Sequence, residues 1–581
     1  MFLRSVSAAN GQHTYLRLVE NYRQAGKTKQ RVVAHLGRKD LLAPHLDSLV
    51  RLLQADEAAP RWVNTEQVSA PGAWSWGPIL AARRLFDGLS LGAILDGRRK
   101  HLRHGQPLSE RVFALLANRL TWPGSEHALA EWLEQFYVCT AAGSRWQPQW
   151  KQWRRVKVSF EQLRLWYQTL DDLLPEKERL EKEIYLELRG LFSLKPDLVF
   201  YDITSTYFEG EGPSELARYG YSRDGKPRQR QIVIGVVMMD GWPIAHHVFA
   251  GNRQDKTTVA EVVEDLNRRF ELNRVVLVGD RGMVKVETLK QLHEAGQGYL
   301  VGLQRRNRKD TYEYIRQAEA HNQWEECAMG VAAREKATPP KSWVQEVAGK
   351  QPGTRVFVIK SEEREQYERA MRTQSMERAR QDLEAVQKRI ANGDLKEPDK
   401  IGAAVARALR RNHGHRYFEW KLEKGQLQFS EHRVNFEREK AYEGKYVLQT
   451  EEQNLTPLGA VDAYKDLNEV ERGFSHLKSL VEVRPVYHRW DSRVQAHVLV
   501  ASLAFLLDRA MEKKLKAAGS AISSVVAWRA LESVRCVEIQ VGDRKKLCVT
   551  RGSRQAAEVL KAIGVAEFDP PPAPAGQETV M

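Results

Sequence analysis

Residues 464–478 read Tyr-Lys-Asp-Leu-Asn-Glu-Val-Glu-Arg-Gly-Phe-Ser-His-Leu-Lys, and a helix-start signal, Thr456-Pro457, precedes them. The threonine oxygen can cap the helix, and proline has no N–H to leave unpaired. In such a helix Tyr464, Glu471 and Lys478 are seven residues apart. Seven steps of about 100° come within about 20° of two full turns, so the three side chains line one face. A solvated helix surface is the simplest interpretation of this face, but two aspartates upstream favour a functional site.

Each of these aspartates ends a run of apolar, β-prone residues. Asp202 follows Leu-Val-Phe-Tyr (198–201), and Asp280 follows Val-Leu-Val-Gly (276–279). Strand ends in α/β sheets are common positions for functional side chains, because a rigid element presents them to a crevice. Either aspartate alone is more typical of a turn or a helix cap. Together with Glu471 they indicate a three-carboxylate site for Mg²⁺, suited to phosphodiester chemistry.

The residues between the two aspartates predict how the sheet is built. Two apolar strands, 229–240 and 242–250, flank the turn pair Asp240-Gly241. A helix over 257–270, the Asp280 strand, a helix over 286–295 and a strand over 298–304 follow. This is the element order of a ribonuclease H-like core, in which the first strand, the fourth strand and a later helix each carry one acid. We therefore expect an α/β fold with a mixed five-stranded sheet and flanking helices.

The three motifs resemble those of the DDE transposases of bacterial insertion sequences. More narrowly, the helix resembles a Tyr-x2-Arg-x3-Glu-x6-Lys signature, with Tyr464, Glu471 and Lys478 at the required spacings. Leu467 occupies the arginine position, so a phosphate contact at this point would be lost or supplied from elsewhere, for instance by Arg472. The resemblance covers roughly residues 190–510.

The resemblance implies a catalytic triad of Asp202, Asp280 and Glu471 that binds two Mg²⁺ or Mn²⁺ ions. It implies cleavage of element ends and transfer of the freed 3′-OH strands into target DNA, through a hairpin-ended intermediate. Tyr464, Lys478 and Arg472 become candidate DNA contacts. The implied partners are double-stranded DNA (terminal inverted repeats and target) and a second copy of the chain, which forms the active homodimer.

Composition agrees with a polyanionic partner. The 581 residues contain 90 Lys and Arg against 75 Asp and Glu, a net charge of +15, and phosphate neutralisation dominates non-specific DNA affinity. The four cysteines form no Cys-x2-Cys pair, which argues against zinc fingers and a disulfide framework. The longest apolar run, 498–507, is about half a membrane span and predicts a core helix. We expect a cytoplasmic, nucleoid-associated bacterial protein without a membrane partner.

Six segments are expected along the chain. They are a basic β-hairpin arm (1–60), a helical end-DNA-binding domain (61–192), the first part of the core (193–304), an α+β insertion (305–455), the second part of the core with the Glu471 helix (456–516), and a C-terminal helical region with a disordered tail (517–581). In the helical domain, Trp146, Trp150 and Trp153 lie at helical spacing among basic residues. They are slightly more typical of a packing stripe than of a base-stacking surface.

The insertion opens on a basic cluster that includes Arg305 and Arg306, both candidate DNA contacts. Residues 363–392 predict one long charged helix that pairs with a helix near 403–409, and alternating strands are expected over 416–450. Trp420 is the candidate receiver for a base that leaves the DNA stack during hairpin formation. A tryptophan buried under the helical hairpin is an equally good interpretation.

Two other functions are compatible with parts of the sequence. A haloacid-dehalogenase-like phosphohydrolase would use Asp202 as its nucleophile, but that fold continues its nucleophile strand into a helix and would give Glu471 no role. A catalytically silent, transposase-derived DNA-binding or regulatory protein would not need all three carboxylates, which are present here. An active transposase is the preferred hypothesis.

Overall fold

The computed structural model describes most of the chain. The described residues are 2–8, 13–24, 27–42, 45, 68–97, 106–153, 156–192, 198–253, 258–272, 276–279, 286–294, 296–305, 309–327, 341–479, 481, 483, 485–541, 544–565 and 569–572. At 152–153, 156–158, 198, 202, 286–288, 291, 309, 468–475, 477, 479 and 544 only the backbone is described. The chain divides into two compact units, Met1–Gly72 with Glu538–Lys546, and Ala73–Val537 with Leu547–Met581.

The first unit contains a three-stranded antiparallel sheet. Strands β2 (Thr14–Gln24) and β3 (Lys27–Arg38) pair as the expected hairpin, with the connecting residues 25–26 outside the described part, and helix α1 (Lys39–Leu42) follows. The expected two-stranded arm is incomplete, because β1 (Phe2–Ser7) pairs with the other edge of β2. Its six residues are too short for their alternation to stand out in the sequence, although pairing gives β2 a second neighbour and shields one of its edges.

The central sheet of the second unit begins with five strands in the predicted order along the chain. They are β7 (Leu198–Tyr207), β8 (Gln231–Met239), β9 (Trp242–Ala250), β10 (Val276–Gly279) and β11 (Gly298–Gly302), with helices α9 (Val259–Phe270) and α10 (Val286–Glu294) between the later strands. The hairpin β7–β8–β9 is antiparallel, whereas β10 is parallel to β7 and β11 is parallel to β10. Asp240 and Gly241 turn the β8–β9 hairpin with positive φ at both residues, as a tight primed turn requires.

The prediction of a five-stranded sheet is wrong, because the insertion contributes four more strands. The full order is β12-β13-β14-β17-β11-β10-β7-β8-β9. The added strands are β12 (Glu325–Cys327), β13 (Ser342–Ala348), β14 (Arg355–Ser361) and β17 (Lys445–Thr450). Strand β17 runs antiparallel to both β11 and β14, so it covers the edge that β11 would otherwise expose.

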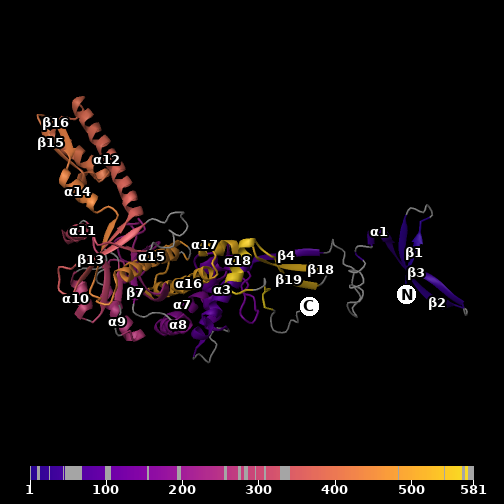
Figure 1. Ribbon diagram of the computed structural model, residues 1–581. Coiled ribbons are helices and arrows are strands. Elements are labelled where there is room, and N and C mark those ends of the chain that lie inside the picture. The colour runs from indigo at the N-terminus through magenta and orange to yellow at the C-terminus, as the bar shows by residue number, and fades with distance from the viewer. Residues whose placement is uncertain are drawn as a thin grey trace. The chain divides into compact units, whose positions relative to one another are not determined.

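Beyond the sheet, the insertion forms a helical hairpin with its own small core. Helix α12 (Glu362–Ala391) packs on α13 (Pro398–Arg411), and Leu383 and Val405 are among the residues buried between them. The hairpin β15 (Phe418–Glu423)–β16 (Gln426–Glu431) lies along α12 (Figure 1). The expected run of strands over 416–450 is confirmed in part: β15, β16 and β17 lie in this range, but α14 (Arg433–Ala441) interrupts the run. His432 starts this helix by accepting a hydrogen bond from the Asn435 N–H at 3.3 Å.

Residues 68–192 are mainly helical, and they share one hydrophobic core with the sheet. The elements are β4 (Val68–Ser75), α3 (Gly77–Gly88), α4 (Leu91–Asp96), α5 (Leu108–Thr121), α6 (Leu129–Gln135), β5 (Lys151–Trp153), β6 (Val156–Val158), α7 (Phe160–Leu173), η3 (Leu174–Glu176) and α8 (Lys177–Phe192). The helical spacing expected for Trp146, Trp150 and Trp153 is wrong, because residues 146–150 are not helical and Trp153 lies on strand β5 of the β5–β6 hairpin. Trp146 itself packs on Trp166, with 5.3 Å between ring centroids.

Helix α16 (Asp491–Ala517) is the central element of this core and packs against α3, α5, α7 and β9. It is long and apolar enough to cross a membrane, but 89% of its most apolar window is buried inside the protein. The expected core helix is therefore confirmed.

Further elements are α11 (Lys309–His321), η6 (Gly414–Arg416), α17 (Ser524–Leu531), β18 (Arg535–Val541), β19 (Arg544–Val549) and α18 (Arg554–Ala562). Strands β19, β18 and β4 form a three-stranded sheet in this order.

A buried polar network holds the start of α16 against the helical region. Arg119 Nη2 lies 3.1 Å from His497 Nδ1, and the other ring nitrogen of His497 lies 3.1 Å from the Val483 carbonyl oxygen. Nδ1 therefore accepts from the guanidinium while Nε2–H donates to the carbonyl. Glu126 faces both His488 and His497. Burial alone would raise the pKa of the Glu126 carboxyl, but His488, Arg119 and His497 hold this pKa well below its usual range.

This network predicts a loss of stability in acid. Burial, together with the positive charge of Arg119, lowers the pKa of His497 to about 3. Between about pH 3 and 6.5 the unfolded chain therefore binds a proton at this histidine that the folded chain does not. As the pH is lowered through this range, His497 decreases the free energy of unfolding by up to about 1.4 kcal/mol per pH unit. His497→Asn keeps one donor and one acceptor but cannot titrate. Urea unfolding from about pH 7 to pH 4 should show a shallower pH dependence for this variant than for the wild type.

The matched control is His321→Asn, at an exposed histidine at the end of α11. It should reproduce the wild-type dependence. Identical slopes for His497→Asn and the wild type would show that His497 is not held neutral by its surroundings.

Candidate active site

The candidate site is formed where β7, β10 and the helix α15 (Pro457–Ser479) meet. Strands β7 and β10 are adjacent and parallel, with Val278 opposite Phe200, and α15 packs against both. Asp202 lies in the middle of β7, opposite Val236 of β8, so its expected position at a strand end is wrong. It nevertheless lies beyond the end of the described β7–β10 pairing, which stops at Phe200. Strand β10 ends at Gly279, and Asp280 lies outside the described residues.

Helix α15 starts where the sequence predicts. Thr456 Oγ1 accepts a hydrogen bond from the Gly459 N–H at 3.0 Å, and the helix continues for 23 residues to Ser479. Tyr464, Glu471 and Lys478 therefore belong to one helix. The structure describes only the backbone of Glu471 and Arg472, and Arg306 lies outside the described residues. The convergence of the three carboxylates, and the DNA contacts of Arg472 and Arg306, stay predictions.

Leu467, at the position of the signature arginine, is buried in the main core with 3% exposure. A side chain at this position points into packed apolar surroundings and not toward solvent. The leucine is therefore suited to its site, and an arginine contact from this position would require a different packing of α15.

Tyr464 is half-buried and stacks on Tyr446 of β17, with ring centroids 5.6 Å apart and an interplanar angle of 28°. Tyr446 belongs to the insertion strand that returns the chain to the core sheet. The contact therefore joins α15 to the insertion. Offset ring pairs of this kind contribute about 0.5–1.5 kcal/mol beyond the area that they bury.

Lys478 donates to Asp224 Oδ1 at 2.9 Å, and both side chains are largely buried, at 15% and 5% exposure. Asp224 belongs to the loop between β7 and β8, so this ion pair joins the end of α15 to that loop. The sequence predicts Lys478 as a phosphate contact. In the structure its charge is already balanced by a carboxylate, which a phosphate would have to replace.

A second contact at the end of α15 was not visible in the sequence. His476 Nδ1 lies 2.8 Å from Asp508 Oδ2, and Trp528 Nε1 donates to the other carboxylate oxygen at 3.0 Å. Asp508 is fully buried in α16. Its hydrogen bond raises the pKa of His476 above the ordinary value. The triad fixes the last turn of α15 against α16 and α17, but only the tertiary structure brings its members together.

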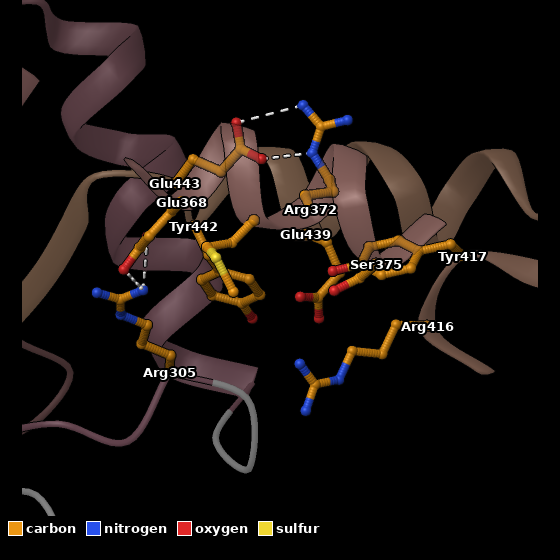
Figure 2. A pocket seen from close by; sticks show the side chains of 10 residues that line it. Arg305, Glu368, Arg372, Ser375, Arg416, Tyr417, Glu439, Tyr442 and Glu443 are labelled. Carbon is orange, nitrogen blue, oxygen red and sulfur yellow. Dashed lines mark hydrogen bonds and ion pairs between the residues drawn. The ribbon is translucent and has the colours of Figure 1, made fainter. Parts of the chain in front are cut away.

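The insertion residues predicted to contact DNA have different environments. Arg305 is buried at 9% exposure, and its Nη1 donates to both oxygens of Glu368, at 2.8 and 2.9 Å. It lines a cavity of about 190 Å³ at the base of α12, into which Arg416 also points (Figure 2). Trp420 is 40% exposed on β15, and a Cβ at Gly402 of α13 would lie 3.8 Å from its ring. Arg305 thus has a structural ion pair, whereas Trp420 keeps part of its ring open.

Two groups of residues in the chain carry side chains of the types that bind metal ions. Asp202, Asp280 and Glu471 offer only carboxylate oxygens, the donor type that Mg²⁺ and Mn²⁺ prefer. The second group, Glu126, His488 and His497, has donor atoms within 4.8 Å of one another. There the lone pair of His497 Nδ1 already accepts from the Arg119 guanidinium, and this cation would oppose a metal ion. The second group therefore fits a structural polar network better than a metal centre.

Comparisons with known proteins agree with this geometry. Residues 195–507, more than half of the chain, match the family model described as transposase DDE domain. Residues 3–64 match the model described as IS1634 family transposase, N-terminal domain. No curated protein matches the chain.

Among solved structures, the chain is similar to the piggyBac transposase in a synaptic complex with hairpin DNA. The identity is 10% and the TM-score 0.33, over 78% of this chain and 79% of that one. The match over 195–507 spans β7, β10 and most of α16, and it includes the whole of α15. The chain belongs to the DDE transposase family of insertion sequences.

Proposed function

We propose that the chain is an active transposase that cuts the ends of its insertion sequence and joins the freed 3′-OH strands to target DNA. The observation that supports this most is the packing of α15 against β7 and β10. These three elements carry or immediately precede all three acids of the motif. The β11-β10-β7-β8-β9 half of the sheet also has the strand directions of a ribonuclease H-like core.

Asp202, Asp280 and Glu471 would hold two Mg²⁺ or Mn²⁺ ions. When bound, such ions activate the attacking oxygen and stabilise the leaving oxygen of a phosphodiester. The register supports the proposal for the two aspartates. Val276 to Val278 pair with Leu198 to Phe200 in parallel, so the segments that precede the two aspartates lie side by side. The chain's own contribution is to hold the carboxylates on neighbouring strands and to bring Glu471 to them on a capped helix.

DNA is the proposed substrate, as terminal inverted repeats and as target, and the proposed active form is a homodimer. The net charge of +15 favours a polyanionic partner. A haloacid-dehalogenase-like hydrolase fits less well, because β7 leads to the antiparallel hairpin β8–β9 and not to a helix. A catalytically silent DNA-binding protein remains the second candidate, and a metal-dependent cleavage assay distinguishes it from the transposase.

The first test removes single carboxylates. Asp202→Asn and Glu471→Gln should abolish cleavage of labelled end DNA in Mg²⁺ while leaving end binding within about twofold, since the charge change is small against the whole basic surface. Cleavage is followed on denaturing gels and binding by mobility shift. Asp240→Asn, in the turn of the β8–β9 hairpin, is the control. If Asp202→Asn or Glu471→Gln still cleaves end DNA, the substituted carboxylate is not required for cleavage and the proposed site is wrong.

The second test concerns Lys478 and its partner Asp224. If a phosphate replaces Asp224, Asp224→Asn should tighten end binding and steepen its salt dependence by about one counterion, because an ammonium is set free. Lys478→Ala should weaken binding, and the double variant should lose the gain of Asp224→Asn. Glu271→Gln, which breaks the exposed Lys182–Glu271 pair at 2.9 Å, changes net charge equally and is the control. If the double variant keeps the tighter end binding of Asp224→Asn, Lys478 does not contact the DNA and its role is structural.

The third test concerns Trp420, which we propose receives an unstacked base during hairpin formation. Trp420→Ala should slow hairpin formation about 5- to 100-fold, the range expected for one lost base–aromatic stack, and spare the first nick. Trp420→Phe should retain most of the activity. Hairpin formation is measured on denaturing gels with end DNA that is already nicked. If Trp420→Ala forms hairpins at the wild-type rate, Trp420 does not receive a base, and its ring only packs against α13.

A further inference from the structure

Four large aromatic side chains are strongly exposed on two segments, one that follows β7 and one that follows α15. Tyr219 (63%) and Tyr221 (79%) lie on the loop between β7 and β8. Tyr487 (60%) and Trp490 (66%) lie on the connector between α15 and α16. Scattered single aromatics on a surface need no explanation, but a group on adjoining segments does. We call these four residues the aromatic surface.

Main-chain and side-chain hydrogen bonds join the two segments. The Val486 N–H donates to the Tyr207 carbonyl at 3.1 Å, and the Glu209 N–H donates to the Val486 carbonyl at 3.1 Å. The Leu216 N–H donates to Asp491 Oδ1 at 3.0 Å. Each member of the aromatic surface lies within five residues of one of these contacts. The surface is thus placed where the strand of Asp202 ends and where the helix of Glu471 is succeeded by α16.

The loop that bears the two tyrosines is anchored to the sheet. Arg218 exchanges two main-chain hydrogen bonds with Gln231, at 3.1 and 2.8 Å. Gly220 lies so close to Gly251 that a Cβ at position 220 would be 1.9 Å from the Gly251 carbonyl oxygen. Any other residue would push the loop away. The tyrosine rings are therefore exposed on fixed backbone, which reduces the entropy that a ligand must overcome.

Cations accompany the rings. Residues 218–230 contain five basic residues and one acid, Asp224, which is paired with Lys478. The guanidinium of Arg223 lies 5.7 Å from the centre of the Tyr221 ring, that of Arg230 lies 5.8 Å from Tyr219, and that of Arg493 lies 5.2 Å from Trp490. Exposed rings beside positive charge are the two parts of a surface for single-stranded nucleic acid, since bases stack on the rings and cations neutralise the backbone.

We propose that the aromatic surface binds unpaired DNA bases next to the active site, a role that deepens the proposed function and depends on DNA being the substrate. Bases in an intact duplex are stacked on one another and offer no free face, so the surface selects strands that are opened or unpaired. Stacking accepts any base, so this binding is independent of sequence.

The test compares single-stranded and duplex DNA in the full-length protein, without divalent metal. The probes are a fluorescein-labelled oligothymidylate and a duplex of equal length, followed by anisotropy. Tyr221→Ala and Trp490→Ala should each weaken single-strand binding about 5- to 100-fold and leave duplex binding unchanged, because each ring stacks on one base. Tyr221→Phe and Trp490→Phe should keep most of the affinity. Tyr367→Ala, at a tyrosine 65% exposed on α12, is the control and should match the wild type.

A second readout is the fluorescence of 2-aminopurine placed in the single strand, which stacking on the rings should quench in the wild type and less in the alanine variants. Unchanged single-strand affinity in both alanine variants, or an equal loss for single strand and duplex, would overturn the proposal. Neither measurement requires cleavage. A wild-type protein that fails to cut DNA but shows the ring-dependent single-strand affinity would refute the proposed transposase activity and uphold the aromatic surface.

Discussion

The contact of α15 with β7 and β10 is the constraint on which the rest of the structure depends. Glu471 is separated from Asp202 by more than 260 residues, and only this packing brings their elements together. Three tertiary contacts help to fix α15: the Tyr464–Tyr446 stack, and the His476–Asp508 and Lys478–Asp224 pairs at its end. The Thr456 cap defines where the helix starts. A helix attached along its whole length can hold a carboxylate more rigidly than a loop can.

The insertion is attached to the same framework. It follows β11 along the chain, adds β12, β13 and β14 to the same sheet, and ends with β17, which pairs with β11 on one side and with β14 on the other. The strands before and at the end of the insertion, β11 and β17, are therefore paired with each other. Tyr446 of β17 also stacks on Tyr464, so the insertion packs directly against α15.

Much of the core could be predicted from the sequence because its signals are local. The Asp240-Gly241 turn, the Thr456-Pro457 helix start and the long helix α12 depend on residues within a few positions of one another. The wrong predictions concern short strands and strands whose partners are distant. Strands β12 and β13 join the central sheet through β14, which itself pairs with β17 far along the chain, and β1 is a short strand that pairs only with β2. The charged helix α14 interrupts an apparent strand pattern, and Asp508 shows its role only when α15 and α17 reach it.

The burial of Leu467 explains why an apolar residue occupies this position of α15. Position 467 faces the core, so an arginine there would bury its charge or displace packed apolar side chains. Either change costs free energy. Leucine instead contributes to the packing that fixes α15. The positive charge near the end of this helix is supplied by Lys478 and by the basic loop that Asp224 holds beside it. One ion pair therefore couples α15 to the loop that carries Tyr219 and Tyr221, so that displacement of Asp224 by a phosphate would alter both at once.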